Sequence, residues 1–99
     1  MAEQKLSVIA RMQAKQGKEN EVKQKLAALI GPTRKEPGCI SYLLHQSAED
    51  KTSFMFYEHW AKKKDLDEHL KKPYIKTFMD RAEKLLDGSV TITLWKMIE

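Results

Sequence analysis

The spacing of the hydrophobic residues changes repeatedly along this chain, and the order of these changes restricts its fold more than any other feature. Residues 5–15 alternate between apolar and polar side chains, which predicts a strand that ends before Gly17. Over residues 18–31 the apolar side chains recur every three to four positions, which predicts an amphipathic helix. Gly31-Pro32 is expected to kink or interrupt this helix, before a further turn over residues 33–36.

The second half of the chain contains the same two kinds of spacing. Alternation predicts two strands over residues 39–47 and 52–60, and the short polar loop between them predicts a hairpin. Helical spacing predicts a short helix over residues 65–72 and a longer one over residues 73–86, which begins with a proline. Alternation returns over residues 89–98 and predicts the last strand.

Alternation also assigns side chains to the faces of these strands. In the strand over residues 39–47, the side chains of Ile40, Tyr42 and Leu44 are predicted to share one face. The last strand is predicted to have two apolar sets on opposite faces: Val90, Ile92, Leu94 and Ile98 on one, and Trp95 and Met97 on the other. Within the longer helix, Phe78 and Met79 are expected in the core.

The predicted order of elements is β-α-β-β-α-β, which is the ferredoxin-like split βαβ arrangement. The expected fold class is therefore α+β, with an antiparallel sheet and the helices on one of its faces. A chain of 99 residues has room for one domain, and no linker or repeat divides it. Residues 1–99 are thus expected to form a single domain.

Apolar residues also occur on the sheet face that the helices are not expected to cover. These residues are Ile9, Met55, Tyr57, Trp95 and Met97. A large exposed apolar patch is typical of an interface, and a chain of 99 residues forms only a thin core by itself. We therefore expect a homodimer in which two sheets pack face to face.

Charge and composition argue against several classes of partner. The net charge is +4, but only three of the 18 basic residues are arginine, so a solvated lysine-rich surface is favoured over a nucleic-acid interface. No apolar run approaches the roughly 20 residues of a membrane span. The single cysteine, Cys39, excludes an intrachain disulfide and a CxxC redox pair. A cytoplasmic protein without membrane or nucleic-acid partners is expected.

A few polar residues lie at positions that would border an apolar core. His69 lies between Leu66 and Leu70 on the short helix, so it is either a packed histidine or a general base at the mouth of a pocket. Glu58 and Trp60 share a strand face, and they form either ordinary packing or a pocket wall with one polar group. His59 is interpreted as a solvated or interface residue, and His45 as a structural or solvated residue unless an isomerase pocket includes it together with His69 and Glu58. No sequence motif for a metal or cofactor occurs, so none is expected.

Several segments spread along the chain have a familiar order and spacing: VIARM (8–12), GKE (17–19), PTRKEPGCISY (32–42), FMFYEHW (54–60), DEHL (67–70) and PY (73–74). Through these segments the chain resembles the antibiotic biosynthesis monooxygenase family over nearly its whole length, and within it the small quinol-monooxygenase-type members. The resemblance implies a ferredoxin-like homodimer whose two sheets form a dimeric α+β barrel, with a pocket between sheet and helices in each subunit. It also implies oxygenation of phenolic or quinol-like substrates by O₂ without metal or flavin.

Individual residues match the family's pattern unevenly. Trp60 matches a tryptophan that ends the third strand in many members, Glu58 matches the acid before it, and His69 matches a histidine of the short helix. The haem-degrading branch has an asparagine, a tryptophan and an iron-ligating histidine where this chain has Ala10, His69 and Met79. These departures argue against haem degradation. Phe56 similarly replaces an asparagine that some polyketide-oxidising members use.

The sequence thus predicts a cofactor-independent monooxygenase that oxidises a quinol-like or phenolic aromatic substrate with O₂. His69 and Trp60 are the predicted catalytic residues. The predicted substrate-binding residues are Ala10, Phe56, Glu58, Tyr74, Phe78 and Met79. Two alternatives stay open: an isomerase of a small metabolite with a wetter pocket, which would not need O₂, and a non-catalytic dimeric module that binds aromatic ligands.

Overall fold

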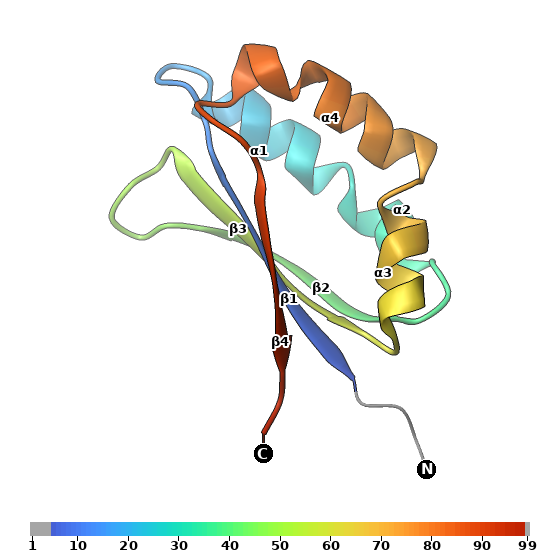
Figure 1. Cartoon of the computed structure of the whole chain (residues 1–99). Helices are drawn as coiled ribbons and strands as arrows, with labels where there is room; N and C mark the ends of the chain where they lie inside the picture. The colour runs from blue at the N-terminus through green and yellow to red at the C-terminus, as the bar shows by residue number, and fades with distance from the viewer. Residues whose placement is uncertain (1–4, 99) are drawn as a thin grey trace.

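The computed structural model describes residues 5–98, which form four strands and four helices (Figure 1). The strands are β1 (Leu6–Gln13), β2 (Cys39–Gln46), β3 (Ser53–Trp60) and β4 (Thr91–Lys96). The helices are α1 (Glu19–Ala27), α2 (Ile30–Arg34), α3 (Lys63–His69) and α4 (Pro73–Leu85). The predicted fold class is confirmed, because this order is β-α-β-β-α-β with each helical segment divided in two.

The strands form one open antiparallel sheet in the order β2-β3-β1-β4. The four helices all lie over the same face of this sheet (Figure 1). The two central strands, β1 and β3, pair along their whole length from Leu6 opposite Trp60 to Gln13 opposite Ser53. Every second residue of β3 is buried, so one face of the central strands forms the floor of the core.

Local sequence signals explain parts of the helix boundaries. Glu19 and Glu21 lie in the first turn of α1, where acidic side chains interact favourably with the helix dipole. The predicted interruption occurs, but earlier than expected: α1 ends at Ala27, and Gly31-Pro32 lies within α2, which begins at Ile30. Pro73 opens α4, a position where its missing N–H group costs no hydrogen bond. Within the residues described, no helix is long and apolar enough to cross a membrane.

Ile40 does not share the core-facing side of β2 as predicted. The pairing of β2 with β3 shifts between Cys39 and Ser41, so Ile40 is the additional residue of a β-bulge. Its side chain is 48% exposed, whereas Cys39 packs against the core at the position opposite Trp60. A bulge of one residue reverses the alternation of faces, which explains why the prediction for Ile40 was wrong.

The last strand is shorter than predicted, and part of its predicted core face is exposed. β4 ends at Lys96, and Ile98 lies beyond it, fully exposed. Leu94 is 45% exposed although it pairs with the buried Val8. β4 is an edge strand, and Ile92 is its last residue that lines the cavity beneath the helices, so Leu94 lies beyond that covered part of the sheet.

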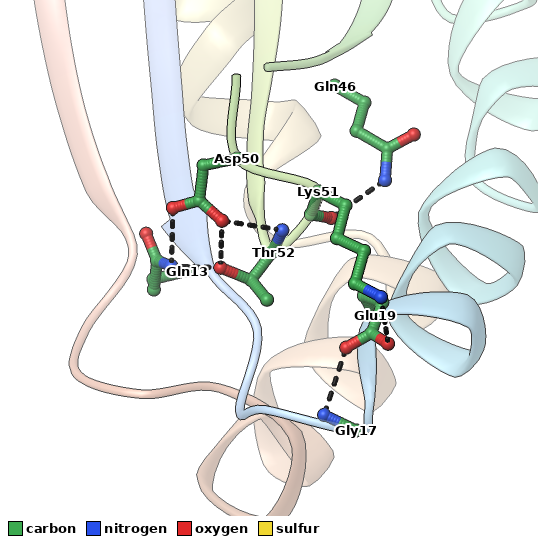
Figure 2. A network of polar contacts seen from close by, with 7 residues as sticks. All are labelled: Gln13, Gly17, Glu19, Gln46, Asp50, Lys51 and Thr52. Carbon is green, nitrogen blue, oxygen red and sulfur yellow. Dashed lines mark hydrogen bonds and ion pairs between the residues drawn. The ribbon is translucent and has the colours of Figure 1, made fainter. Parts of the chain in front are cut away.

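A group of polar residues near the protein surface fixes the turn that joins β2 to β3. This turn network consists of Gln13, Asp50 and Thr52 (Figure 2). The Asp50 carboxylate accepts a hydrogen bond from the backbone N–H of Thr52 at 3.0 Å and one from Gln13 Nε2 at 3.2 Å. The network therefore connects the turn to the end of β1, away from the residues of the candidate site.

Candidate functional site

An apolar cavity of about 50 Å³ lies between the sheet and the helices. Its floor comes from β1 and β3, and its walls come from α1, α3, α4 and the beginning of β4. Only three of the lining residues carry a nitrogen or oxygen in their side chains: Tyr42, Glu58 and His69. A cavity of this composition, apolar with a few convergent polar groups, is typical of sites that bind small organic molecules.

Glu58 is a buried carboxyl group whose protonation changes close to neutral pH. It lies on β3, where alternation directs it into the core, and its Oε1 accepts a hydrogen bond of 2.8 Å from Trp60 Nε1. Burial raises the pKa of Glu58 to about 7, against the lowering effect of the Trp60 hydrogen bond. The nearby Glu36 carboxylate raises the pKa further. Glu58 can therefore both donate and accept a proton at physiological pH.

His69 is paired with a second buried carboxyl group. Its Nδ1 lies 2.9 Å from Glu36 Oε2, and both side chains are buried. Because a carboxylate only accepts hydrogen bonds, His69 donates Nδ1–H, which leaves Nε2 with the lone pair that can take a proton. The Tyr74 hydroxyl donates to the same Glu36 oxygen. Glu36 thus orients the His69 ring from the loop that precedes β2.

Aromatic rings enclose the imidazole of His69. The Trp60 and His69 ring centroids are 4.8 Å apart, and the Tyr42 ring meets His69 edge-on at 5.5 Å. Tyr42 also stacks on Phe56 at 4.3 Å between centroids. Burial raises the pKa of Tyr42 well above its usual value, so its hydroxyl stays protonated at neutral pH. The rings hold His69 in one orientation and exclude water from it.

The structure brings most of the predicted site residues to this cavity. Its lining includes Ala10, Phe56, Glu58, His69, Phe78 and Met79. Trp60 is fully buried next to the cavity, where it contacts Glu58 and His69 without lining the space. Tyr74 lies in a separate groove between α1 and α4. Met79 is 43% exposed, so its predicted core position is wrong: it lines the cavity while part of its side chain remains in contact with solvent.

Sequence reasoning missed two residues of this site. Glu36 lies between basic residues and Pro37-Gly38, a context typical of a solvated turn. Tyr42 was predicted only to share a strand face with Ile40 and Leu44, and its contact with His69 depends on how α3 packs over β2 and β3. Within residues 5–98, no three His, Cys, Asp or Glu side chains gather as a metal site would require.

Comparisons with known proteins agree on one family. The family model described as antibiotic biosynthesis monooxygenase matches residues 6–81. "Putative monooxygenase Rv0793" of Mycobacterium tuberculosis is 33% identical over 90% of this chain and 87% of its own length. An uncharacterized protein of Synechocystis, sll1783, is 32% identical over 99% of this chain and 67% of its own length.

Solved structures show the same relationship in three dimensions. The crystal structure of PA3566 from Pseudomonas aeruginosa superposes with a TM-score of 0.93 and 29% identity, covering 100% of this chain and 99% of that protein. The structure of Rv0793 gives a TM-score of 0.88 at 29% identity, with 96% of each chain covered. With a family model matching most of its length and relatives that share its fold, the chain belongs to the antibiotic biosynthesis monooxygenase family.

Proposed function

We propose that this protein is a cofactor-independent monooxygenase that oxidises a quinol-like or phenolic aromatic substrate with O₂. The observation that carries this proposal is one apolar cavity into which two buried proton-exchanging groups, His69 and Glu58, both face. Such a site can bind an aromatic ring, remove a proton from its hydroxyl group and exclude water. Membership of the monooxygenase family supports the same class of reaction.

The reaction needs no electron source other than the substrate. A phenol that loses its proton becomes electron-rich enough to transfer an electron to O₂, which forms the new bond between carbon and oxygen. For the simplest quinol, hydroquinone and O₂ give hydroxybenzoquinone and water. One oxygen atom enters the ring, and the other leaves as water with two hydrogens of the substrate.

Each polar residue has a defined part in this proposal. His69 Nε2 accepts the phenolic proton, while Glu36 keeps the ring in the orientation that exposes this nitrogen. Glu58 in its neutral form donates a hydrogen bond to a substrate oxygen, because its pKa of about 7 leaves much of it protonated. Trp60 is a positioning residue in this scheme, since it holds Glu58 by a hydrogen bond and packs on His69.

The apolar residues of the proposed site bind the substrate ring. Ala10 and Phe56 form its floor on β1 and β3, and Phe78 and Met79 form its wall on α4. The absence of a side chain beyond Cβ at Ala10 leaves space over the sheet. An apolar cavity favours an aromatic substrate over a small polar metabolite, which would need more than three polar lining groups.

The experiment follows O₂ uptake with hydroquinone as the probe, together with product analysis in air and under anaerobic conditions. Anaerobic incubation should abolish turnover, and His69→Ala should lower the rate at least about tenfold, equivalent to about 1.4 kcal/mol. The control is His45→Ala, since His45 is exposed and its ring bonds only the Leu43 carbonyl group. Turnover without O₂ would favour an isomerase, and ligand binding without any turnover would favour a binding module.

We further propose that the protein functions as a homodimer joined through the open sheet face. The helices leave this face uncovered (Figure 1), and Trp95 on it is 54% exposed. Leu43 on β2 is exposed on the same face, so apolar side chains extend across the sheet. Static light scattering should give twice the chain mass, and a mass of 11.5 kDa would contradict the dimer.

A further inference from the structure

The cavity is too small for the ring of its proposed substrate unless a neighbouring side chain moves. Its volume is about 50 Å³, whereas an apolar cavity that accepts benzene has a volume of roughly 150 Å³. The nearest additional space is a groove of about 340 Å³ between α1 and α4. Leu29 and Phe78 line both the cavity and the groove, so they form the wall between them.

The groove differs from the cavity in its charge. Its charged lining residues are both cations: Lys25 on the last turn of α1 and Arg81 on α4. Neither of them forms an ion pair with any residue of the described chain. No acidic residue lines the groove, and its other polar side chains are Tyr74 and Thr77. The Tyr74 hydroxyl already donates to Glu36, so Lys25, Arg81 and Thr77 are the groups of the groove that suit a carboxylate.

The cavity, in contrast to the groove, is unfavourable for a carboxylate. Glu58 lines it, and the Glu36 carboxylate lies directly behind His69. A carboxylate of the substrate placed there would be repelled by the Glu36 carboxylate and would lose its hydration in an apolar cavity. A phenol that also carries an acid group can therefore lie in only one direction, with its hydroxyl toward His69 and its acid group toward Lys25 and Arg81.

We propose that the substrate is an acidic phenol or quinol that occupies the cavity and the groove together. Its ring enters the cavity when Phe78 rotates out of the shared wall, and its acid group stays in the groove with Lys25 and Arg81. The inference rests on the proposed function, because it names the class of phenol on which that site acts. It also explains why the space for binding is divided into an apolar and a cationic part.

The test measures binding of an inert phenol with and without its charge. The probes are 3-(4-hydroxyphenyl)propanoate, whose two-carbon chain can cross the shared wall, and its uncharged amide, both followed by isothermal titration calorimetry. The wild type should bind the acid about fivefold more tightly than the amide, or better. The double variant Lys25→Gln/Arg81→Gln should bind both probes equally, with little change in its affinity for the amide.

The matched control is Lys23→Gln/Lys76→Gln, which removes the same charge from α1 and α4 outside the groove and should keep the preference for the acid. Equal affinities for acid and amide in the wild type, no binding of either probe, or the same loss in the control would overturn the inference. Oxidation of neutral hydroquinone without any acid preference would leave the proposed function standing alone. Acid preference without O₂ uptake would contradict the proposed function instead.

Discussion

Glu58 in the cavity and Asp50 in the turn network are two carboxyl groups that accept hydrogen bonds in very different surroundings. The pKa of Glu58 is raised to about 7, mainly because burial disfavours the charged form, although Trp60 donates a hydrogen bond to it. The pKa of Asp50 is lowered, because Thr52 and Gln13 donate to it while the group stays in water (Figure 2). Burial by the helices, rather than the number of polar partners, thus gives Glu58 proton exchange at neutral pH.

The same difference in burial determines how much the residues of each region should contribute to the free energy of unfolding. When a buried polar group loses its hydrogen-bond partner, no water molecule can take the partner's place. An exposed group that loses its partner forms a hydrogen bond with water instead. The cluster around His69 consists of buried side chains, and the turn network consists of exposed or partly exposed ones. Substitutions in the cluster should therefore have larger effects than matched substitutions in the network, and the predictions below rank them.

The largest effect should be the pH dependence that Glu58 gives to folding. Between pH 4.5, near which an unburied glutamate titrates, and about 7 the unfolded chain releases this proton while the folded chain retains it. The free energy of unfolding should therefore fall as pH rises through this range, by an amount on the order of 3 kcal/mol. Glu58→Gln keeps an acceptor for Trp60 but cannot ionise, so this part of the slope should disappear.

Urea denaturation of the wild type and Glu58→Gln at several pH values between about 4.5 and 8 measures this prediction. The difference between the two proteins isolates Glu58, since all other titrating groups are common to both. The variant should gain stability relative to the wild type as pH rises. Parallel curves for the two proteins would show that Glu58 ionises in the folded state as it does in the unfolded chain.

Glu36→Ala should have the next largest effect. It removes the carboxylate that accepts hydrogen bonds from His69 Nδ1–H and from the Tyr74 hydroxyl. Loss of these partners should lower the free energy of unfolding by about 1–3 kcal/mol. Nitrogen NMR of His69 should also show a mixture of ring tautomers in place of one, because the carboxylate no longer selects Nδ1–H.

Glu36→Gln is the matched control, since its amide oxygen can still accept the hydrogen bonds that Glu36 Oε2 accepts but carries no negative charge. It should lose less stability than Glu36→Ala and retain more of the single tautomer. Equal stability of Glu36→Ala and the wild type would contradict the interpretation of this contact as a buried pair. An unchanged tautomer in Glu36→Ala would show that the surrounding rings, rather than Glu36, fix the imidazole.

Local patterns predicted the fold because each strand and helix has a clear hydrophobic period. In β3 the buried residues Phe54, Phe56 and Glu58 follow the alternation without a break. The failures occur where the face of a residue depends on other segments. The bulge at Ile40 arises from pairing with β3, and the exposure of Leu94 depends on where the helices end over the sheet.

The candidate site shows the same limit more strongly. His69 and Glu58 could be found because each lies at an apolar position of its own helix or strand. Glu36 could not, because it becomes a buried partner of His69 only when the segment before β2 packs against α3 and α4. The pKa of Glu58 was equally inaccessible, since it depends on how completely the helices exclude water.

Asp50→Asn should change stability less than Glu58→Gln or Glu36→Ala does. It tests the exposed carboxyl group of the comparison between Glu58 and Asp50. The lowered pKa of Asp50 means that its charged form stabilises the fold above its unfolded pKa, and that this contribution is lost as pH falls through the folded pKa. At pH 7 the variant should melt less than about 4 °C below the wild type, because the group is exposed and asparagine still accepts from Thr52. The difference between the two proteins should shrink as pH falls through the lowered pKa of Asp50. A larger difference at pH 7 would show that the turn network stabilises the hairpin as strongly as the buried cluster stabilises the site, which would remove burial as the cause of the contrast.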